Sequence, residues 1–265
     1  MFVVDSHCHL DFPDFEAERE AVLARAAAAG VGAMLTISTR VGQFARYAAL
    51  AEAHPRIWCT VGTHPHQAAE EPDITVSDLV GIARHPRCIG IGEAGLDYHY
   101  NLSPPDIARR VFRTHIAAAR ETGLPLVIHA RDADADMIEI LTEEMGKGTF
   151  KAILHCFSSG PELARVGVEL GLLVSFSGIL TFRNSQAIRD IAATVPLDRL
   201  LVETDAPFLA PMPHRGKRNE PAFVVETCKV LAEVKGVPAA EMARITTANF
   251  FRLFAKAEAP AGALA

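Results

Sequence analysis

Side chains that bind metal ions stand at the ends of several short apolar runs in this chain. The first run ends in His7-Cys8-His9, and a strand would point both imidazoles to one side and Cys8 to the other. Four later runs end in, or just before, another imidazole or carboxylate: Glu93, His129, His155 and Asp205. Imidazole and carboxylate ligands without a thiolate favour Zn²⁺ or Mn²⁺, and a carboxylate-rich half also suits Mg²⁺. The pattern predicts a metal site.

Four imidazoles and two carboxylates are too many for one ion that keeps a position open for substrate. Two divalent ions bridged by a carboxylate would use them all, and Glu93, in the middle of the set, is the expected bridge. Two such ions, about 3.5–4 Å apart, can activate a water and hold both the attacking and the leaving oxygen. Asp205 could bind one ion and still accept a proton from that water, which makes it the predicted general base.

Four further residues beside these strand ends could contact a substrate or support a ligand. Glu203 precedes Asp205 by two residues and is predicted either to orient a ligand or to take part in the chemistry. His64 follows the third apolar run and would either touch substrate or pack its own loop. Arg215 and Lys217 belong to a basic loop, which is either a solvated charged face or, at the mouth of a metal site, a clamp for phosphate.

Short apolar runs alternate with stretches of helical spacing along almost the whole chain. Strands are predicted at residues 2–7, 33–38, 57–63, 88–93, 126–129, 152–155, 172–177 and 200–203. Helices are predicted at residues 15–29, 42–54, 77–84, 105–122, 135–145, 161–170, 185–195 and 221–235, with a ninth at 238–254 across the barrel exterior. Eight strand-then-helix units predict an α/β fold, the (β/α)₈ TIM barrel, whose strand ends meet at one mouth. A doubly wound sheet is the alternative, but no Gly-x-Gly-x-x-Gly follows the first strand.

The composition is that of an ordinary globular protein, with 49% hydrophobic and 22% charged residues. The net charge of −6 excludes a generally basic nucleic-acid coat, although it allows a local basic patch. No apolar run reaches the roughly 18 residues of a membrane span, and the start lacks the features of a signal peptide, so we expect a cytoplasmic protein. Residues 1–256 are predicted to form a single domain, in a monomer, and residues 257–265 a flexible tail.

Six motifs together resemble the TatD family of metal-dependent hydrolases, in order over residues 1–255. They are Asp5-Ser6-His7-Cys8-His9-Leu10, Gly62-Thr63-His64-Pro65-His66, Gly92-Glu93-Ala94-Gly95-Leu96-Asp97-Tyr98, His155-Cys156-Phe157-Ser158, Glu203-Thr204-Asp205-Ala206-Pro207 and Arg215-Gly216-Lys217-Arg218-Asn219-Glu220-Pro221. The resemblance implies an amidohydrolase-type TIM barrel with two divalent metals. It also implies deoxyribonuclease activity, often as a 3′-to-5′ exonuclease on single-stranded DNA. By motif position, one metal would take His7, His9, Glu93 and Asp205, and the second would share Glu93 and add His129 and His155.

Two other functions stay open at this point. A related barrel hydrolase could act on a lactone, an amide or a phosphotriester, but such barrels often carry a carboxylated lysine as the bridge where this chain has Glu93. A non-catalytic, metal-binding quality-control factor is the second alternative. The complete set of ligands argues against it, because packing alone does not require four histidines at strand ends.

Overall fold

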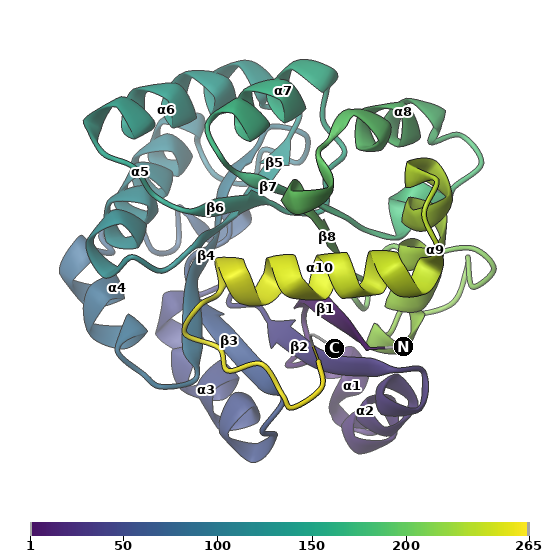
Figure 1. Ribbon diagram of the computed structural model, residues 1–265. Coiled ribbons are helices and arrows are strands. Elements are labelled where there is room, and N and C mark those ends of the chain that lie inside the picture. Colours follow the sequence, from purple (N-terminus) through teal and green to yellow (C-terminus); the bar gives the residue numbers. More distant parts are fainter. Residues whose placement is uncertain (1, 264–265) are drawn as a thin grey trace.

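The computed structural model describes residues 2–263, which form a barrel of eight parallel strands surrounded by helices (Figure 1). Each strand pairs with the next in chain order, and backbone hydrogen bonds from Asp205 N to His7 O (2.9 Å) and from His9 N to Ala206 O (2.8 Å) join the last strand end to the first. The strands are β1 (Val3–Cys8), β2 (Val31–Thr36), β3 (Ile57–Val61), β4 (Cys88–Asp97), β5 (Leu126–Arg131), β6 (Ala152–Leu154), β7 (Leu173–Phe176) and β8 (Leu200–Val202). The predicted (β/α)₈ barrel is confirmed.

Helices of the outer layer follow the strands in the predicted order. They are α1 (Pro13–Glu16), α2 (Arg19–Ala28), α3 (Phe44–Ala53), α4 (Val76–Ala83), α5 (Pro105–Thr122), α6 (Asp134–Lys147), α7 (Pro161–Glu169), α8 (Gln186–Thr194), α9 (Val224–Lys235) and α10 (Ala239–Leu253). Short 3₁₀ turns add η1 (Val41–Gln43), η2 (Pro65–Gln67), η3 (Gly178–Thr181), η4 (Leu197–Arg199) and η5 (Pro221–Phe223). Among the helices described, none is long and apolar enough to cross a membrane.

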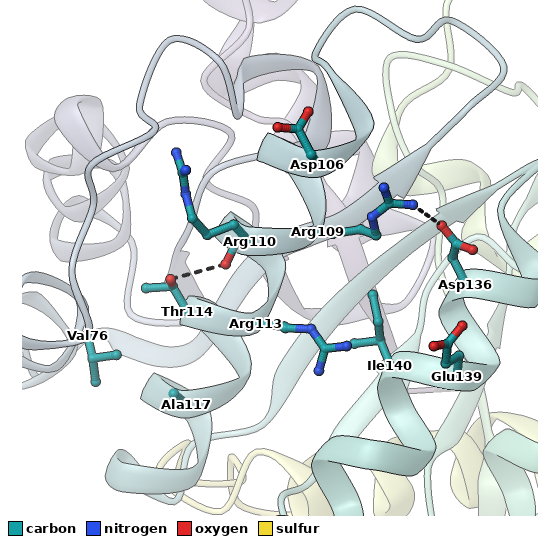
Figure 2. Close-up of a pocket in the computed structure, with 10 residues that line it drawn as sticks. All are labelled: Val76, Asp106, Arg109, Arg110, Arg113, Thr114, Ala117, Asp136, Glu139 and Ile140. Carbon is teal, nitrogen blue, oxygen red and sulfur yellow. Dashed lines mark hydrogen bonds and ion pairs between the residues drawn. The ribbon is translucent and has the colours of Figure 1, made fainter.

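Ion pairs join neighbouring helices of this layer. Between α5 and α6 they border a cavity of about 710 Å³ on the outside of the barrel (Figure 2). Arg109 bonds Asp136 at 2.6 Å, and Arg113 contacts Glu143 and Glu144, each at 2.6 Å. These arginines are therefore already neutralised by acids of the facing helix, and the cavity lies apart from the strand ends that carry the predicted ligands.

Two of the predicted elements differ in the structure. The helix predicted at residues 15–29 is divided into α1 and α2, and Glu18 at the division pairs with Arg218 of the loop after β8 at 3.0 Å. Strand β4 continues four residues past its predicted end, to Asp97, alongside β5. Glycine allows this pairing, because a Cβ on Gly95 would lie 1.9 Å from the carbonyl oxygen of His129.

Helix α10 takes a different position from the predicted one. It crosses the end of the barrel where the strands begin, and Asn249 donates hydrogen bonds to the carbonyls of Leu197 and Leu200 at 2.8 and 2.9 Å (Figure 1). Phe250 and Phe254 belong to the same buried cluster as the inward-facing strand residues. The helix thus closes one end of the barrel, because its aromatic stripe fits the open interior, and the other end is left for the predicted site.

The C-terminal segment continues this packing. Ala257 and Ala263 are buried in the cluster that contains Phe250 and Phe254. Positions 264 and 265 lie outside the described residues. The flexibility predicted for residues 257–265 stays a prediction.

Close approach of β3 and β4 beneath the mouth leads to a stability prediction. A Cβ on Gly62 would lie 2.3 Å from Cα of Gly92, a backbone atom that cannot turn aside. We expect Gly62→Ala to lower the free energy of unfolding by about 1–3 kcal/mol, the usual cost of overpacking. Urea denaturation in the presence of a chelator measures this difference without a contribution from bound metal.

The matched control is Gly81→Ala in α4. Gly81 is exposed, and nothing would lie within 4 Å of its added Cβ. Alanine favours a helix interior by up to about 1 kcal/mol over glycine, so this variant should be slightly stabilised. Equal unfolding midpoints for the two variants would contradict the close contact between the strands.

Candidate metal centre

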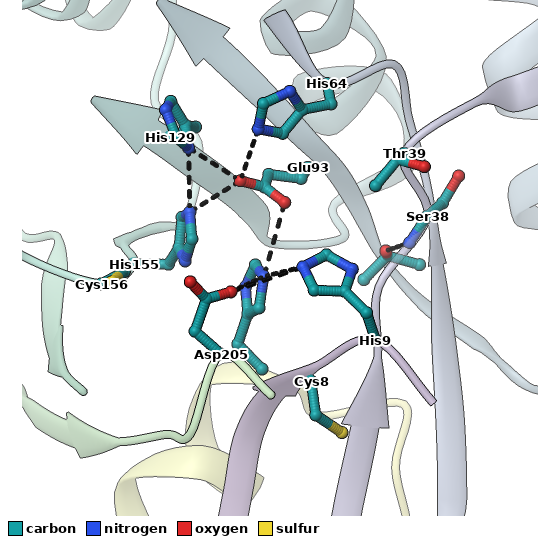
Figure 3. Close-up of polar contacts among 12 residues, drawn as sticks. Cys8, His9, Ser38, Thr39, His64, Glu93, His129, His155, Cys156 and Asp205 are labelled. Carbon is teal, nitrogen blue, oxygen red and sulfur yellow. Dashed lines mark hydrogen bonds and ion pairs between the residues drawn. The ribbon is translucent and has the colours of Figure 1, made fainter. Parts of the chain in front are cut away.

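The predicted ligands converge at the mouth of the barrel around the carboxylate of Glu93 (Figure 3). One oxygen, Oε1, lies 2.9 Å from Nδ1 of His129 and 2.7 Å from Nε2 of His155. The other oxygen, Oε2, lies 3.4 Å from Nε2 of His7. The two oxygens of Glu93 therefore face different halves of the cluster, as a bridging carboxylate must.

The second half of the cluster joins β1 to the loop after β8. His7 and His9 bring their Nε2 atoms within 3.3 Å of each other, which confirms that they share one side of the chain. Oδ1 of Asp205 lies 3.5 Å from Nε2 of His7 and 3.4 Å from Nε2 of His9. Cys8 points away and directs its thiol to the carbonyl of Leu35. These three side chains can hold one cation with Glu93 beside them.

Buried hydrogen bonds hold Asp205 at this position. The carboxylate of Asp5 accepts bonds from the backbone N–H of Thr204 at 2.9 Å and from its hydroxyl at 2.6 Å. Asn219, which is fully buried, donates to the carbonyls of Thr204 at 2.9 Å and Phe208 at 2.6 Å. Asp205 itself has a φ of 58°, a left-handed conformation that Asp and Asn tolerate better than most residues. The loop is therefore fastened on both sides of the ligand.

Two further carboxylates contact the imidazoles from outside the cluster. Glu203 is fully buried, and its Oε1 lies 3.1 Å from Nδ1 of His155 and accepts a bond from the N–H of Cys156 at 2.8 Å. This contact matches the prediction that Glu203 orients a ligand, although its role stays a prediction. Asp97 lies 3.0 Å from Nε2 of His129, a contact that was not predicted. Its signal in the sequence is its place four residues after Glu93, which puts it on the same face once β4 extends that far.

His64 contacts the candidate ligands themselves. Its Nε2 is 3.4 Å from Oε1 of Glu93, and its ring centroid is 4.6 Å from that of His129. Donor atoms of His64, Glu93 and His129 lie within 4.8 Å of one another. His64 is therefore a seventh group that could hold a metal ion or accept a proton, a possibility that the predicted ligand set did not contain.

Electrostatics at the cluster favour a cation. Burial alone would raise the pKa of Glu93, but His155 and His64 outweigh it and hold that pKa well below its usual range. Burial would likewise raise the pKa of Asp205, but the contact with His9 lowers it. Burial would lower the pKa of His155, yet the charges of Glu93 and Glu203 raise it well above its usual value. Both carboxylates are thus ionised, and the potential around them attracts positive charge.

The residues present fit divalent cations. Six imidazole and carboxylate groups in a mostly buried cluster are the donors that Zn²⁺, Mn²⁺ and, for the carboxylates, Mg²⁺ accept. Among residues 2–263, Oε2 of Glu93 is buried without a hydrogen-bond partner. A buried carboxylate oxygen without a donor is costly unless a cation or a proton donor meets it.

Two cavities meet at this cluster. One, of about 700 Å³, and a second, of about 740 Å³, share His129, Arg131, His155, Asp205 and Leu209 in their walls. The first cavity is also lined by Arg40 and Arg46. No role was predicted for the arginines in these walls: Arg40 follows β2, Arg46 lies in α3 and Arg131 ends β5, and none belongs to one of the six motifs.

The basic loop lies elsewhere on the mouth. Arg215 and Lys217 are exposed and do not line either cavity, and the guanidinium of Arg215 lies 3.9 Å from the ring centre of Phe182. Their contact with substrate stays a prediction. His64, in contrast, lines the first cavity.

Comparisons with known proteins agree with this geometry. The family model described as "TatD related DNase" matches residues 4–255. The "Uncharacterized metal-dependent hydrolase YcfH" of Escherichia coli is 43% identical over 96% of both chains. The "3'-5' ssDNA/RNA exonuclease TatD" of Erwinia tasmaniensis is 37% identical over 94% of this chain and 98% of its own. The crystal structure of the E. coli TatD homologue YJJV superposes with a TM-score of 0.88 at 30% identity, covering 96% of this chain and 98% of its own. This chain belongs to the TatD family and is a metal-dependent hydrolase.

Proposed function

We propose that this protein is a deoxyribonuclease that removes nucleotides from the 3′ end of single-stranded DNA. The observation that carries the proposal is the position of Glu93, whose two oxygens face two groups of ligands at the mouth of the barrel. A pair of metal sites so placed suits in-line displacement at phosphorus. The printed name of the Erwinia relative, a 3′-to-5′ exonuclease on single-stranded DNA and RNA, supports the same substrate class.

The proposed ligand sets follow the two halves of the cluster. His7, His9 and Asp205 would hold one divalent cation with Glu93, while His129 and His155 would hold the second with the same glutamate. Such cations act as Lewis acids on phosphate oxygens and lower the pKa of the attacking water. Mg²⁺, Mn²⁺ and Zn²⁺ all suit these donors.

The protein's own groups would then bind the phosphate and move the proton. Asp205, which lines both cavities, would accept the proton of the water that attacks phosphorus. Arg131, which also lines both cavities, would attract the scissile phosphodiester and the adjacent phosphates of the strand. Glu203 would keep the ring of His155 in the orientation that presents Nε2 to the cluster.

Charge in the cavity disfavours the alternative hydrolase, whose substrates are neutral. Arg131 lines the first cavity and makes no ion pair among the described residues, whereas Arg40 pairs with Glu70 and Arg46 lies 3.6 Å from Asp11. A phosphodiester is an anion and gains from the guanidinium of Arg131, whereas a lactone, an amide or a phosphotriester is neutral and gains little. The non-catalytic, metal-binding factor is disfavoured because Glu93 and Asp205 line a cavity, whereas a purely structural metal site is closed by its own ligands.

A substrate panel tests the proposal. Full-length protein supplied with Mg²⁺, Mn²⁺ or Zn²⁺ is incubated with 5′-labelled single-stranded DNA, the matching RNA, blunt duplex DNA, and a set of lactones and amides. We expect a ladder of products shortened from the 3′ end of single-stranded DNA, abolished by chelator and by a blocked 3′ terminus. Hydrolysis of a lactone or amide with DNA left intact would support the alternative hydrolase. Stoichiometric metal with no hydrolysis of any substrate would support the non-catalytic factor.

We further propose that residues 1–256 act as one hydrolase domain in a monomer. The barrel strands, the ligand cluster and both cavities all lie within that range. Sedimentation at assay concentration measures the oligomeric state, and the cytoplasmic location stays a prediction.

A further inference from the structure

Exposed apolar side chains gather around the candidate metal centre. Among residues 2–263, the large hydrophobic side chains that are exposed are Tyr100, Leu102, Leu197, Phe208 and Met212. All except Leu197 lie in the loops that follow β4 and β8, on the side of the barrel where the ligands converge. Exposed apolar surface beside a polar site is typical of a binding surface.

Phe208 extends the cluster outward from His9. The ring of Phe12 stacks on that of His9 with centroids 4.7 Å apart, and Phe208 meets Phe12 edge to face at 5.9 Å. The side chain of Phe208 is 51% exposed. Its backbone is fixed, because its N–H donates to Asp205 O at 2.9 Å and its carbonyl accepts the bond from Asn219. Phe208 therefore presents a rigidly mounted, half-exposed ring beside one half of the ligand set.

Tyr100 occupies the equivalent position beside the other half. It is 54% exposed, and its ring centroid is 5.3 Å from that of His66. His66 bonds Asp97 at 2.9 Å, and Asp97 in turn contacts His129. Tyr100 and Phe208 line the same cavity of about 700 Å³, whose wall also contains Glu93. The two exposed rings thus line one cavity whose wall also carries the bridging carboxylate.

Positive charge accompanies the rings. The guanidinium of Arg131 lies 4.8 Å from the ring centre of Tyr100. Within the described part of the chain, Arg131 makes no ion pair, whereas Arg40 pairs with Glu70 at 2.9 Å. Aromatic faces beside cationic side chains are the combination by which proteins bind single-stranded nucleic acid without sequence preference.

We propose that Phe208 and Tyr100 stack the two bases that flank the scissile phosphate, Phe208 on the His9 side and Tyr100 on the His129 side. This inference rests on the proposed nuclease function and adds to it a site for unpaired bases. A base inside a duplex has both faces covered by its neighbours, so it cannot lie against either ring. The rings would therefore select single strands, and, because every base has a π-face, they would do so for any sequence.

The test compares substrates with and without the flanking bases. Short single-stranded oligothymidylates are made with an abasic sugar at the 3′-terminal or at the penultimate position, so that the phosphates are unchanged. Cleavage (kcat/KM) is measured for the wild type, Phe208→Ala and Tyr100→Ala. Removing one base should slow the wild type by about 5- to 150-fold, the range for one base–aromatic stack. Compared with the wild type, each alanine variant should be slower by that factor on the intact substrate. On the abasic substrate that lacks the base facing the substituted ring, the variant and the wild type should have almost the same rate.

Controls separate stacking from damage to the site. Leu197→Ala removes an exposed apolar side chain of 38% exposure at the opposite end of the barrel and should leave every rate unchanged. Phe208→Trp and Tyr100→Phe keep an aromatic face and should retain the discrimination against abasic substrates. Metal content of each variant should equal that of the wild type.

Two outcomes would overturn the inference while leaving the nuclease intact. One is an equal loss by the alanine variants on intact and abasic substrates, and the other is no effect of abasic sugars on the wild type.

Failure of the proposed function gives a different result, because the metal-loaded wild type would then cleave no oligonucleotide. In that case 2-aminopurine at the 3′ end of the same strand reports stacking by fluorescence quenching. Quenching that Phe208→Ala or Tyr100→Ala abolishes would support the base site, and no quenching by the wild type would overturn it.

Discussion

Asp205→Asn is expected to lower kcat by about 10²–10⁴-fold, the usual contribution of a general base. Asparagine keeps the size of the side chain and one oxygen for the metal, but it cannot accept a proton from the attacking water. Its backbone can also keep the φ of 58° found at this position, since Asn tolerates the left-handed conformation. The variant should therefore keep its fold and most of its metal, and the loss should appear in kcat more than in KM.

Single-turnover cleavage of single-stranded DNA, with metal content measured on the same preparation, provides the test. His64→Asn is the informative comparison, because Nε2 of His64 lies 3.4 Å from Oε1 of Glu93 and an imidazole there could accept the proton in place of Asp205. If Asp205→Asn holds its metal and cleaves at nearly the wild-type rate while His64→Asn does not, His64 is the base.

Glu93→Gln is expected to reduce bound metal from about two ions per chain to one or fewer. The two oxygens of Glu93 face His129 and His155 on one side and His7 on the other. An amide has one oxygen and no charge, so it cannot bridge two cations. Loss of a metal that stabilises the phosphate charge removes several kcal/mol of transition-state stabilisation, which corresponds to a fall in kcat/KM of about 10³-fold or more.

Metal analysis of protein loaded without chelator measures this effect directly, and Glu203→Gln is its matched control. Glu203 is an equally buried glutamate that contacts His155 but does not lie between the two halves of the cluster. Its variant should keep both ions and lose only about 10- to 100-fold in activity. A wild-type stoichiometry that stays at one under saturating metal would contradict the bridge, and no bound metal at all would contradict the metal site.

The fold and the convergence of the six candidate ligands were open to prediction from the sequence. Each predicted strand is a short apolar run, and His7, Glu93 and His129 stand at or near the ends of three of them. Parallel strands of a closed barrel all end at one mouth, so the strand pattern alone implies that these side chains meet. The alternation along a strand likewise separates His7 and His9 from Cys8.

Positions set by loops and by packing between distant segments were not open to prediction. Arg131, the last residue of β5, lies in the cavity walls, while Arg215, in the loop after β8, stacks on Phe182 outside them. The contact of His64 with Glu93 depends on the path of the loop after β3, and the support of His129 by Asp97 depends on the extension of β4. The preference of individual residues for helix or strand gives no information about such contacts.

The sequence by itself thus determined the barrel, the family and the set of metal-binding side chains, because periodicity and strand ends are local properties that a closed parallel barrel converts into one site. Only the tertiary structure decided how that site is divided and lined. It placed the oxygens of Glu93 between two groups of ligands, and it brought Phe208 and Tyr100 to one cavity from loops that are more than a hundred residues apart. It also placed α10 over the opposite end of the barrel. These arrangements depend on close packing between segments remote in the chain, where the shape of each neighbour decides which side chain faces the cavity.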